Sequence, residues 1–259
     1  MNGPDGRIIL VTGASGGLGA ALASGFACQR YRVVISARSR EKLQAVADGI
    51  ARNGGQVLAI ANDVTQRAQV KALAEEIQQR WGAVQILVNN AGIARAASFS
   101  EMTDAQWDDT LATNLTGAYN CCKAFLPAMI QAKWGRIINI ASTTAKVGYS
   151  HVTAYTASKH GLLGLTRSLA LETARQGVTV NAICPGYIDD ERTRENARAM
   201  AVKMGKSVGD IEKVFAASAP QNRLIEPDEV ATLTLLLASE KLGGMTGQAI
   251  NVDGGAVMV

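Results

Sequence analysis

Short apolar runs alternate with longer amphipathic segments along the whole chain, and this alternation constrains the fold more than any other feature. The runs expected to form strands are residues 8–11, 32–39, 58–64, 85–92, 136–142, 178–186 and 248–255. Helical patterns lie between them, for example at residues 41–55, 69–82 and 104–130. Strands that alternate with helices form a parallel sheet with helices on both faces. We therefore predict an α/β chain with a seven-stranded parallel sheet.

A glycine-rich turn follows the first apolar run and opens a helix, in the stretch RIILVTGASGGLGAALA. Gly13, Gly17 and Gly19 are spaced as a variant of the dinucleotide-binding fingerprint, with the first gap lengthened. Glycine lets the backbone approach a pyrophosphate, and the N–H groups at the helix start then face the phosphates. The turn, with Ser15 as a hydroxyl donor, predicts a nucleotide site in a single-domain Rossmann fold. A plain turn is the alternative.

The end of the second expected strand indicates which dinucleotide binds. An NAD site usually places a carboxylate there to bind the ribose 2′-hydroxyl. This strand instead ends in Ser36-Ala37-Arg38-Ser39, and the first acid, Glu41, lies in the following helix. The Arg38 guanidinium is suited to a 2′-phosphate. We favour NADP(H), with NAD(H) as the alternative and a solvated surface arginine as the plainer explanation of Arg38.

Tyr155 and Lys159 stand four residues apart in YTASK, thirteen residues after Ser142 in the run IINIAS. One helical turn places the phenol and the ammonium on the same face, where the cation lowers a phenol pKa that is usually about 10. Ser142, at the end of an expected strand, is placed to hold a carbonyl oxygen. The trio predicts proton transfer to or from a carbonyl or alcohol oxygen. For an isolated match, a tyrosine packed against a lysine stem is the alternative.

Taken together, these motifs resemble the short-chain dehydrogenase/reductase family over nearly the whole chain. The matching residues are TGASGGLG (12–19), Asp63, NNAG (89–92), Asn114, Ser142, YTASK (155–159), Pro185-Gly186 and the closing VDGG. The resemblance implies an NAD(P)-dependent oxidoreductase acting on CH–OH or C=O groups. The region around Ser142 and Tyr155 looks most like bacterial 3-oxoacyl and polyketide ketoreductases and 3-hydroxyacyl dehydrogenases.

The resemblance also implies a role for each matching residue. Tyr155 is then the general acid/base, Lys159 lowers its pKa and binds the nicotinamide ribose, and Ser142 orients the substrate oxygen. Asn114 holds a water that links Lys159 to solvent, and Asp63 contacts the adenine. The residues expected to bind the cofactor are Gly13, Ser15, Gly17, Leu18, Gly19, Arg38, Asp63, Val64, Asn90, Ala91, Gly92, Tyr155, Lys159, Pro185, Gly186 and Ile188. No metal is expected, because the two histidines lack ligand spacing.

Residues 187–220 form the most polar long connection and depart from the family pattern. Asp190 stands where the family usually has a threonine that holds the nicotinamide amide. Either its carboxylate accepts from that amide, or the loop takes another path. We predict one or two short helices that form a substrate lid, within a single domain over 1–259 whose cofactor-binding and catalytic core is 1–186. The candidate substrate contacts, which could equally be packing residues, are Thr144, Val147, Tyr149, His151, Tyr187 and Met200.

The function predicted is NADPH-dependent reduction of a ketone, such as a β-keto acyl thioester, to a secondary alcohol with Tyr155 as general acid. One alternative is an NAD(P)-dependent secondary alcohol or 3-hydroxyacyl dehydrogenase working in the oxidative direction. Another is a catalytically silent nucleotide-binding regulatory protein, against which the intact catalytic set argues. Lys133, Arg136 and Arg175 either steer an acidic acyl carrier protein or the phosphates of coenzyme A, or are scattered surface charges.

Composition limits the remaining classes. The net charge is +4, without a basic stripe for nucleic acid, and no stretch approaches the roughly 18 apolar residues of a membrane span. The N-terminus shows no signal peptide, and the four cysteines lack a C-x-x-C pair, as expected for free thiols in the cytoplasm. The expected helices at about 104–131 and 153–175 carry apolar residues such as Leu162, Leu165 and Leu169. They resemble the assembly surface of the family, which implies a homotetramer, unless these leucines simply pack on the sheet.

Overall fold

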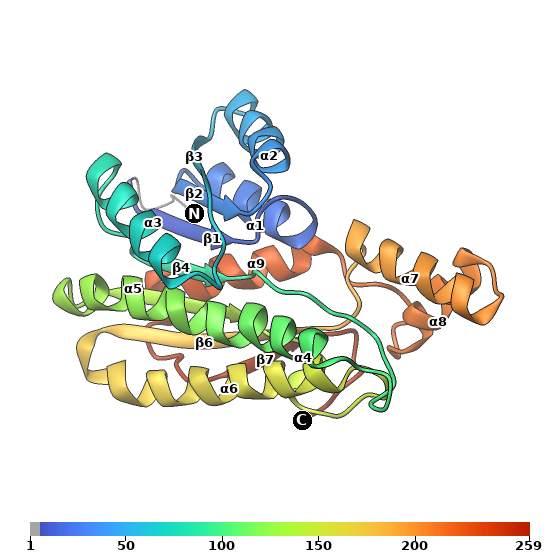
Figure 1. Cartoon of the computed structure of the whole chain (residues 1–259). Helices are drawn as coiled ribbons and strands as arrows, with labels where there is room; N and C mark the ends of the chain where they lie inside the picture. Colours follow the sequence, from blue (N-terminus) through green and yellow to red (C-terminus); the bar gives the residue numbers. More distant parts are fainter. Residues whose placement is uncertain (1–5) are drawn as a thin grey trace.

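The computed structural model describes residues 6–259, which form one parallel sheet between two layers of helices (Figure 1). The strand order is β3-β2-β1-β4-β5-β6-β7. The strands are β1 (Ile8–Thr12), β2 (Arg32–Ala37), β3 (Gln56–Ala61), β4 (Ile86–Asn89), β5 (Gly135–Ile140), β6 (Val178–Pro185) and β7 (Ala249–Val252). The predicted α/β class with a seven-stranded parallel sheet is confirmed. The strand order reverses at β1 and β4, and ligands bind at the carboxyl ends of strands at such a point.

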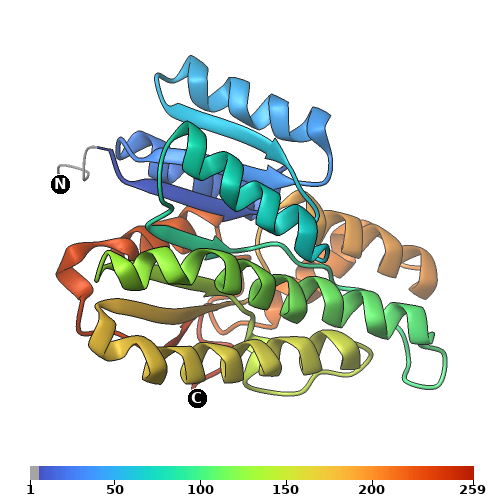
Figure 2. The ribbon, with the colours of Figure 1, turned by 60° about the vertical axis from the view of Figure 1, so that its left-hand side comes forward.

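Helices cover both faces of the sheet. The helices are α1 (Gly17–Cys28), α2 (Arg40–Arg52), α3 (Arg67–Arg80), α4 (Asp104–Leu111), α5 (Gly117–Gln131), α6 (Thr153–Thr173), α7 (Glu191–Met204), α8 (Val208–Ala217) and α9 (Pro227–Ala238). Helices α1, α2 and α9 share a buried core with one face of β1 and β2. Helices α3, α5 and α6 lie side by side over the other face (Figure 2). Within residues 6–259, none of the helices combines the length and the apolar character that a membrane span requires.

Among the element boundaries that differ from the sequence prediction, two lie near the site and change its description. The third strand ends at Ala61, before Asp63, because the Asp63 carboxylate accepts the N–H of Thr65 and turns the chain. The long helix expected over 104–130 is interrupted between α4 and α5 by a π-helical turn, Ala112–Thr116, which contains Asn114. Single π-turns inside α-helices occur frequently at functional sites.

Helices α7 and α8 lie beyond the carboxyl ends of the strands, at the right of Figure 1. They pack on each other through a small apolar core of Ala197, Ala201, Ile211 and Phe215. The ring of Tyr187, just before α7, stacks on Phe215 with the ring centroids 4.3 Å apart. The helices expected within residues 187–220 are therefore present, and they form a layer of their own.

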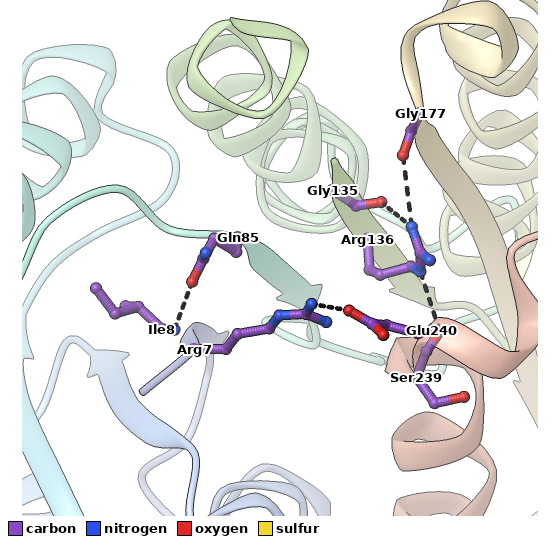
Figure 3. Close-up of polar contacts among 8 residues, drawn as sticks. All are labelled: Arg7, Ile8, Gln85, Gly135, Arg136, Gly177, Ser239 and Glu240. Atoms are coloured by element: carbon purple, nitrogen blue, oxygen red, sulfur yellow. Dashed lines mark hydrogen bonds and ion pairs between the residues drawn. The ribbon is translucent and has the colours of Figure 1, made fainter. Parts of the chain in front are cut away.

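The opposite, amino-terminal edge of the sheet is held by arginines (Figure 3). The Arg136 side chain is only 4% exposed, and it donates to the carbonyls of Gly135, Gly177 and Ser239. Arg7 pairs with Glu240 on the same edge. The interpretation of Arg136 as a residue that steers a carrier protein is therefore wrong, because this guanidinium is buried against backbone carbonyls.

Helix α6 shows the same inward packing. Leu162 is 1% exposed, and Leu165 and Leu169 are partly buried against the core. These leucines therefore cover the sheet and do not supply an exposed apolar surface. Tyr119 on α5 and Leu171 on α6 are large apolar side chains that are exposed, at 41% and 85%.

Candidate active site and cofactor cleft

A cleft of about 370 Å³ opens at the carboxyl ends of β1 to β4. Its walls come from the glycine turn, the ends of β2 and β3, the segment after β4, the π-turn and the start of α7. The lining residues are Gly13, Ser15, Ser36, Ala37, Arg38, Ser39, Lys42, Asn62, Asp63, Val64, Ala91, Gly92, Ile93, Thr113 and Arg192. The cleft is therefore where the strand order places a ligand site.

The glycine turn is built so that backbones touch. A Cβ on Gly13, whose φ is +67°, would stand 2.7 Å from the Cα of Ala91. A Cβ on Gly19 would stand 2.4 Å from the carbonyl oxygen of Gly13. Real Cβ atoms do not come so close to backbone, so only glycine fits both positions. The turn thus leaves its backbone exposed to the cleft at the start of α1.

Thr12 and Asn90 fix the turn to the end of β4. The Asn90 side-chain amide donates to the carbonyls of Thr12 and Gly13 at 3.0 and 3.1 Å. The Thr12 hydroxyl accepts the N–H groups of Asn90 and Ala91, each at 3.1 Å. Asn90 therefore holds the backbone of the glycine turn in place. It was predicted to bind the cofactor, but it is not among the residues that line the cleft.

The far end of the cleft is rich in donors and cations. Ser36 is 1% exposed and Asn62 is 5% exposed. Among residues 6–259 the Ser36 hydroxyl and the Asn62 side-chain oxygen find no partner. Arg38 and Lys42 are both exposed on this wall. Orphaned polar atoms beside two cations fit an adenosine whose ribose carries a 2′-phosphate.

Tyr155 and Lys159 project from α6 toward Ser142, which lies just beyond β5. The Lys159 ammonium is 5.6 Å from the centroid of the Tyr155 ring and donates to the carbonyl of Ile140 at 2.7 Å. The Ser142 hydroxyl accepts the N–H of Thr144 at 3.2 Å. These three side chains, which come from the end of β5 and from α6, meet at the carboxyl end of β5.

The charges around these groups differ from the expectation. Burial raises the pKa of Tyr155 above 10.0, while the Ser142 side chain and then the charge of Arg192 lower it. Burial lowers the pKa of Lys159 to about 7, and the charge of Arg192 contributes to that lowering. Lys159 was predicted to lower the pKa of Tyr155, but burial raises that pKa instead, and the Ser142 side chain and then the charge of Arg192 oppose the rise. The reason is that burial favours the neutral forms of both phenol and amine.

Asn114 links α6 to the segment after β4. It is 1% exposed, and its side-chain amide donates to the carbonyl of Ile93 at 2.9 Å and to the hydroxyl of Ser158 at 3.0 Å. Its oxygen accepts the N–H of Ile93 at 2.8 Å. A Cβ on Gly92 would stand 3.2 Å from this oxygen and 3.7 Å from the Lys159 nitrogen. Asn114 and Lys159 therefore meet beside Gly92, at the wall of the cleft.

Several predicted cofactor residues do line the cleft. They are Gly13, Ser15, Arg38, Asp63, Val64, Ala91 and Gly92. The other predicted cofactor residues are not among the residues that line the cleft, namely Gly17, Leu18, Gly19, Asn90, Tyr155, Lys159, Pro185, Gly186 and Ile188. Gly186 packs against Asp253, because a Cβ on Gly186 would stand 3.1 Å from the Cα of Asp253. Ile188 forms a bridge with Ile225.

Besides Ser36, Ala37 and Ser39 at the end of β2, five further lining residues were not predicted from the sequence. They are Lys42, Asn62, Ile93, Thr113 and Arg192. Asn62 and Ile93 adjoin the predicted Asp63 and Gly92, so the motifs pointed to their neighbourhood. Arg192 comes from α7, and no local motif places it in the cleft. Among residues 6–259 there is also no group of three His, Cys, Asp or Glu side chains able to hold a metal ion.

Comparison with known proteins agrees with this geometry. A family model for the short chain dehydrogenase matches residues 7–201. The chain is a member of the short-chain dehydrogenase family. It is 39% identical over 250 residues to the uncharacterized oxidoreductase YxjF of Bacillus subtilis strain 168, covering 96% of this chain and 97% of the relative. It is 36% identical over 255 residues to the 3-oxoacyl-acyl-carrier-protein reductase FabG of Escherichia coli K12, covering 98% and 99%.

A solved structure of this short-chain dehydrogenase fold is also similar. A variant of actinorhodin polyketide ketoreductase, crystallised with NADPH, has a TM-score of 0.95 and 35% identity over 99% of both chains. The family identified from the sequence, the Rossmann fold and the oxidoreductase class acting on CH–OH or C=O groups are therefore confirmed.

At the threonine position of the family, this short-chain dehydrogenase uses Asp190 to begin α7. Asp190 is 7% exposed, and its carboxylate accepts the N–H of Thr193 at 3.0 Å as the helix N-cap. Its other oxygen lies 2.6 Å from where a Cβ on Gly17 would stand. The carboxylate therefore packs α7 against the glycine turn, and Arg192 follows it into the cleft.

Proposed function

We propose that this protein is an NADPH-dependent ketoreductase that reduces a β-keto acyl thioester or a related ketone to a secondary alcohol. The observation that carries the proposal is the meeting of Ser142, Tyr155 and Lys159 beside a cleft that ends at Arg38. Support also comes from the named activity of FabG and from the NADPH in the actinorhodin ketoreductase structure.

Each residue of the proposed catalytic site has a separate role in the reduction. When bound, the reduced nicotinamide supplies the hydride that reduces the carbonyl carbon. Tyr155 gives its phenolic proton to the carbonyl oxygen, and Ser142 holds that oxygen by a hydrogen bond. Because burial raises the pKa of Tyr155, the phenol is protonated at neutral pH, as a general acid must be. Asn114, beside Lys159, opens a path for proton replacement from solvent.

Three phenols border the place where the ketone would lie. Tyr187 and Tyr149 are 42% and 40% exposed. Burial, and then the charges of Tyr149 and Tyr155, raise the pKa of Tyr187. The α7–α8 pair begins four residues after Tyr187. We therefore extend the proposal to residues 187–220 as a substrate lid, with the phenols forming one wall of an acyl pocket.

The proposal also covers assembly and location. We propose a homotetramer, because the exposed Tyr119 and Leu171 leave apolar area on the outer surfaces of α5 and α6. We propose a cytoplasmic location, because all four cysteines are free thiols, which persist in reducing compartments. Light scattering at micromolar concentration tests the assembly, and a monomer would contradict it.

The function is tested by following NADPH absorbance with β-keto thioesters and simple ketones as substrates. Tyr155→Phe should abolish turnover and leave the dissociation constant for NADPH unchanged, because it removes only the transferable proton. Tyr119→Phe, on the exposed surface of α5, is the matched control and should keep full activity. Turnover that survives in Tyr155→Phe would refute the assigned general acid. A wild-type protein that binds NADPH but reduces no ketone would support the regulatory alternative.

A further inference from the structure

Helix α7 carries three arginines in its first two turns, and one of them stands apart. Arg194 pairs with Asp189, and Arg198 pairs with Glu191. Within the described chain, Arg192 has no such ion pair, and it alone of the three lines the cleft. An exposed guanidinium held at the mouth of a cleft without a carboxylate partner is available to an anionic ligand.

The backbone that carries Arg192 is fixed in place. Two residues earlier, the buried Asp190 carboxylate caps α7 and touches the glycine turn at Gly17. Arg192 therefore shares a wall with Gly13 and Ser15, the part of the turn that leaves its backbone open. Its charge also lowers the pKa of both Tyr155 and Lys159. The start of α7, which carries this guanidinium, therefore adjoins the glycine turn, and the Arg192 side chain lines the cleft.

The cations of the cleft are divided between two places. Arg38 and Lys42 stand at the end of β2 and the start of α2, whereas Arg192 stands at the glycine turn. A dinucleotide phosphorylated on its ribose carries a 2′-phosphate at one end and a pyrophosphate in the middle. The pyrophosphate lies over the glycine turn in this class of fold. One group of cations therefore stands where the 2′-phosphate would lie, and Arg192 stands on the side where the pyrophosphate would lie.

We propose that Arg192 binds the cofactor pyrophosphate and so ties the α7–α8 pair to the occupied cleft. The inference rests on the proposed cofactor site and adds a residue that the family motifs do not contain. A guanidinium forms two parallel hydrogen bonds to phosphate oxygens, which an aliphatic or hydroxyl side chain cannot do. Because Arg192 projects from α7, the bond would hold the lid against the nucleotide.

The proposal makes a prediction that separates Arg192 from Arg38. The pyrophosphate is common to NADPH and NADH, whereas only NADPH has the 2′-phosphate. Arg192→Ala should therefore weaken both nucleotides by the same factor, about tenfold or more for a lost charge-assisted contact. Arg38→Ala should weaken NADPH alone. Dissociation constants come from fluorescence titration of the full-length protein with each nucleotide, so no turnover is required.

Two further variants sharpen the test. Arg198→Ala removes an exposed, paired arginine from the same helix and should leave both dissociation constants unchanged. Arg192→Lys keeps the positive charge but cannot form two parallel hydrogen bonds, so its affinity for both nucleotides should lie between the affinities of the wild type and of Arg192→Ala. NADPH should also slow proteolysis within residues 191–217 in the wild type and in Arg198→Ala, and much less in Arg192→Ala.

The outcomes distinguish this inference from the proposed function. If the wild type binds neither nucleotide, the proposed function fails. If the wild type binds both and Arg192→Ala binds them equally well, the assignment of Arg192 is overturned. A loss confined to NADPH would place Arg192 at the 2′-phosphate and would also overturn it. If circular dichroism shows that Arg192→Ala folds poorly, Arg192→Lys serves as the test instead. Wild-type affinity for both nucleotides in Arg192→Lys would refute the paired hydrogen bonds from the guanidinium to the pyrophosphate.

Discussion

Replacing Arg38 with alanine should change which dinucleotide the protein prefers. Arg38 follows β2 and lines the cleft together with Lys42 and Ser36, whose hydroxyl has no partner in the part of the chain that the structure describes. If this wall receives a 2′-phosphate, the guanidinium makes a charge-assisted contact that NADH cannot make. The affinity for NADPH should then fall, and the affinity for NADH should stay the same.

The size of the effect follows from the exposure of the site. A hydrogen bond to a charged group contributes about 1.5–3 kcal/mol. Arg38 is exposed, so solvent screens the contact and the lower end applies. Since each 1.4 kcal/mol is tenfold, we expect roughly a tenfold loss of NADPH affinity. Lys42 remains in the single variant, so adding Lys42→Ala should deepen the loss.

The assay is titration of NADPH and NADH at two salt concentrations. Arg40→Ala is the matched control, because Arg40 begins α2 and is exposed but lies outside the cleft lining. The advantage of the wild type for NADPH should shrink at high salt, because salt screens exposed charges. An equal loss for both nucleotides in Arg38→Ala, or no loss for either, would refute the 2′-phosphate assignment.

Three other predictions test the turn, the sheet edge and the buried amine. Gly19→Ala should weaken NADPH binding, measured by titration, and destabilise the fold by about 2 kcal/mol through overpacking, measured by urea denaturation. Gly164→Ala is the control, because nothing lies within 4 Å of its Cβ position, and it should change neither quantity. Arg136→Ala should lower the free energy of unfolding by about 3 kcal/mol in the same denaturation assay, because three backbone carbonyls lose their charged donor. A decrease of less than about 1 kcal/mol would contradict this. Burial lowers the pKa of Lys159 to about 7, from a usual value of 10.5. Between these two pH values the Lys159 amine binds a proton in the unfolded chain but not in the folded protein. Wild-type stability should therefore rise relative to Lys159→Met as the pH increases through this window, and a flat difference would contradict the low pKa.

Local patterns in the sequence were enough to predict the framework of the site. The glycine turn, the end of β2 and the Tyr155–Lys159 pair each depend on residues within one turn or one helix, where spacing fixes geometry. The parallel sheet was also predictable, because buried parallel strands are continuous apolar runs. All residues of β1 and β6, for example, are buried. The place of the site at the carboxyl ends then follows from topology.

Other features depend on how distant segments pack. Arg136 has the composition of a surface residue, but its place at the start of β5 puts it beneath the carbonyls of Gly177 and Ser239. Asn62 became part of the cleft because β3 ends early and leaves its side chain beside β2. The pKa of Lys159 depends on burial under the end of β5, which no spacing along α6 can express.

The elements, their order and the candidate reacting groups were predictable from the residues, because these features follow from short-range periodicity and backbone sterics. Which charges face the cleft depends on how the folded chain packs. Arg192 lies more than 170 residues beyond the glycine turn in the chain, and the contact of Asp190 with Gly17 brings it there. Electrostatic interaction depends on distance through space, so the charges that act on Tyr155 could not be identified until the chain was folded.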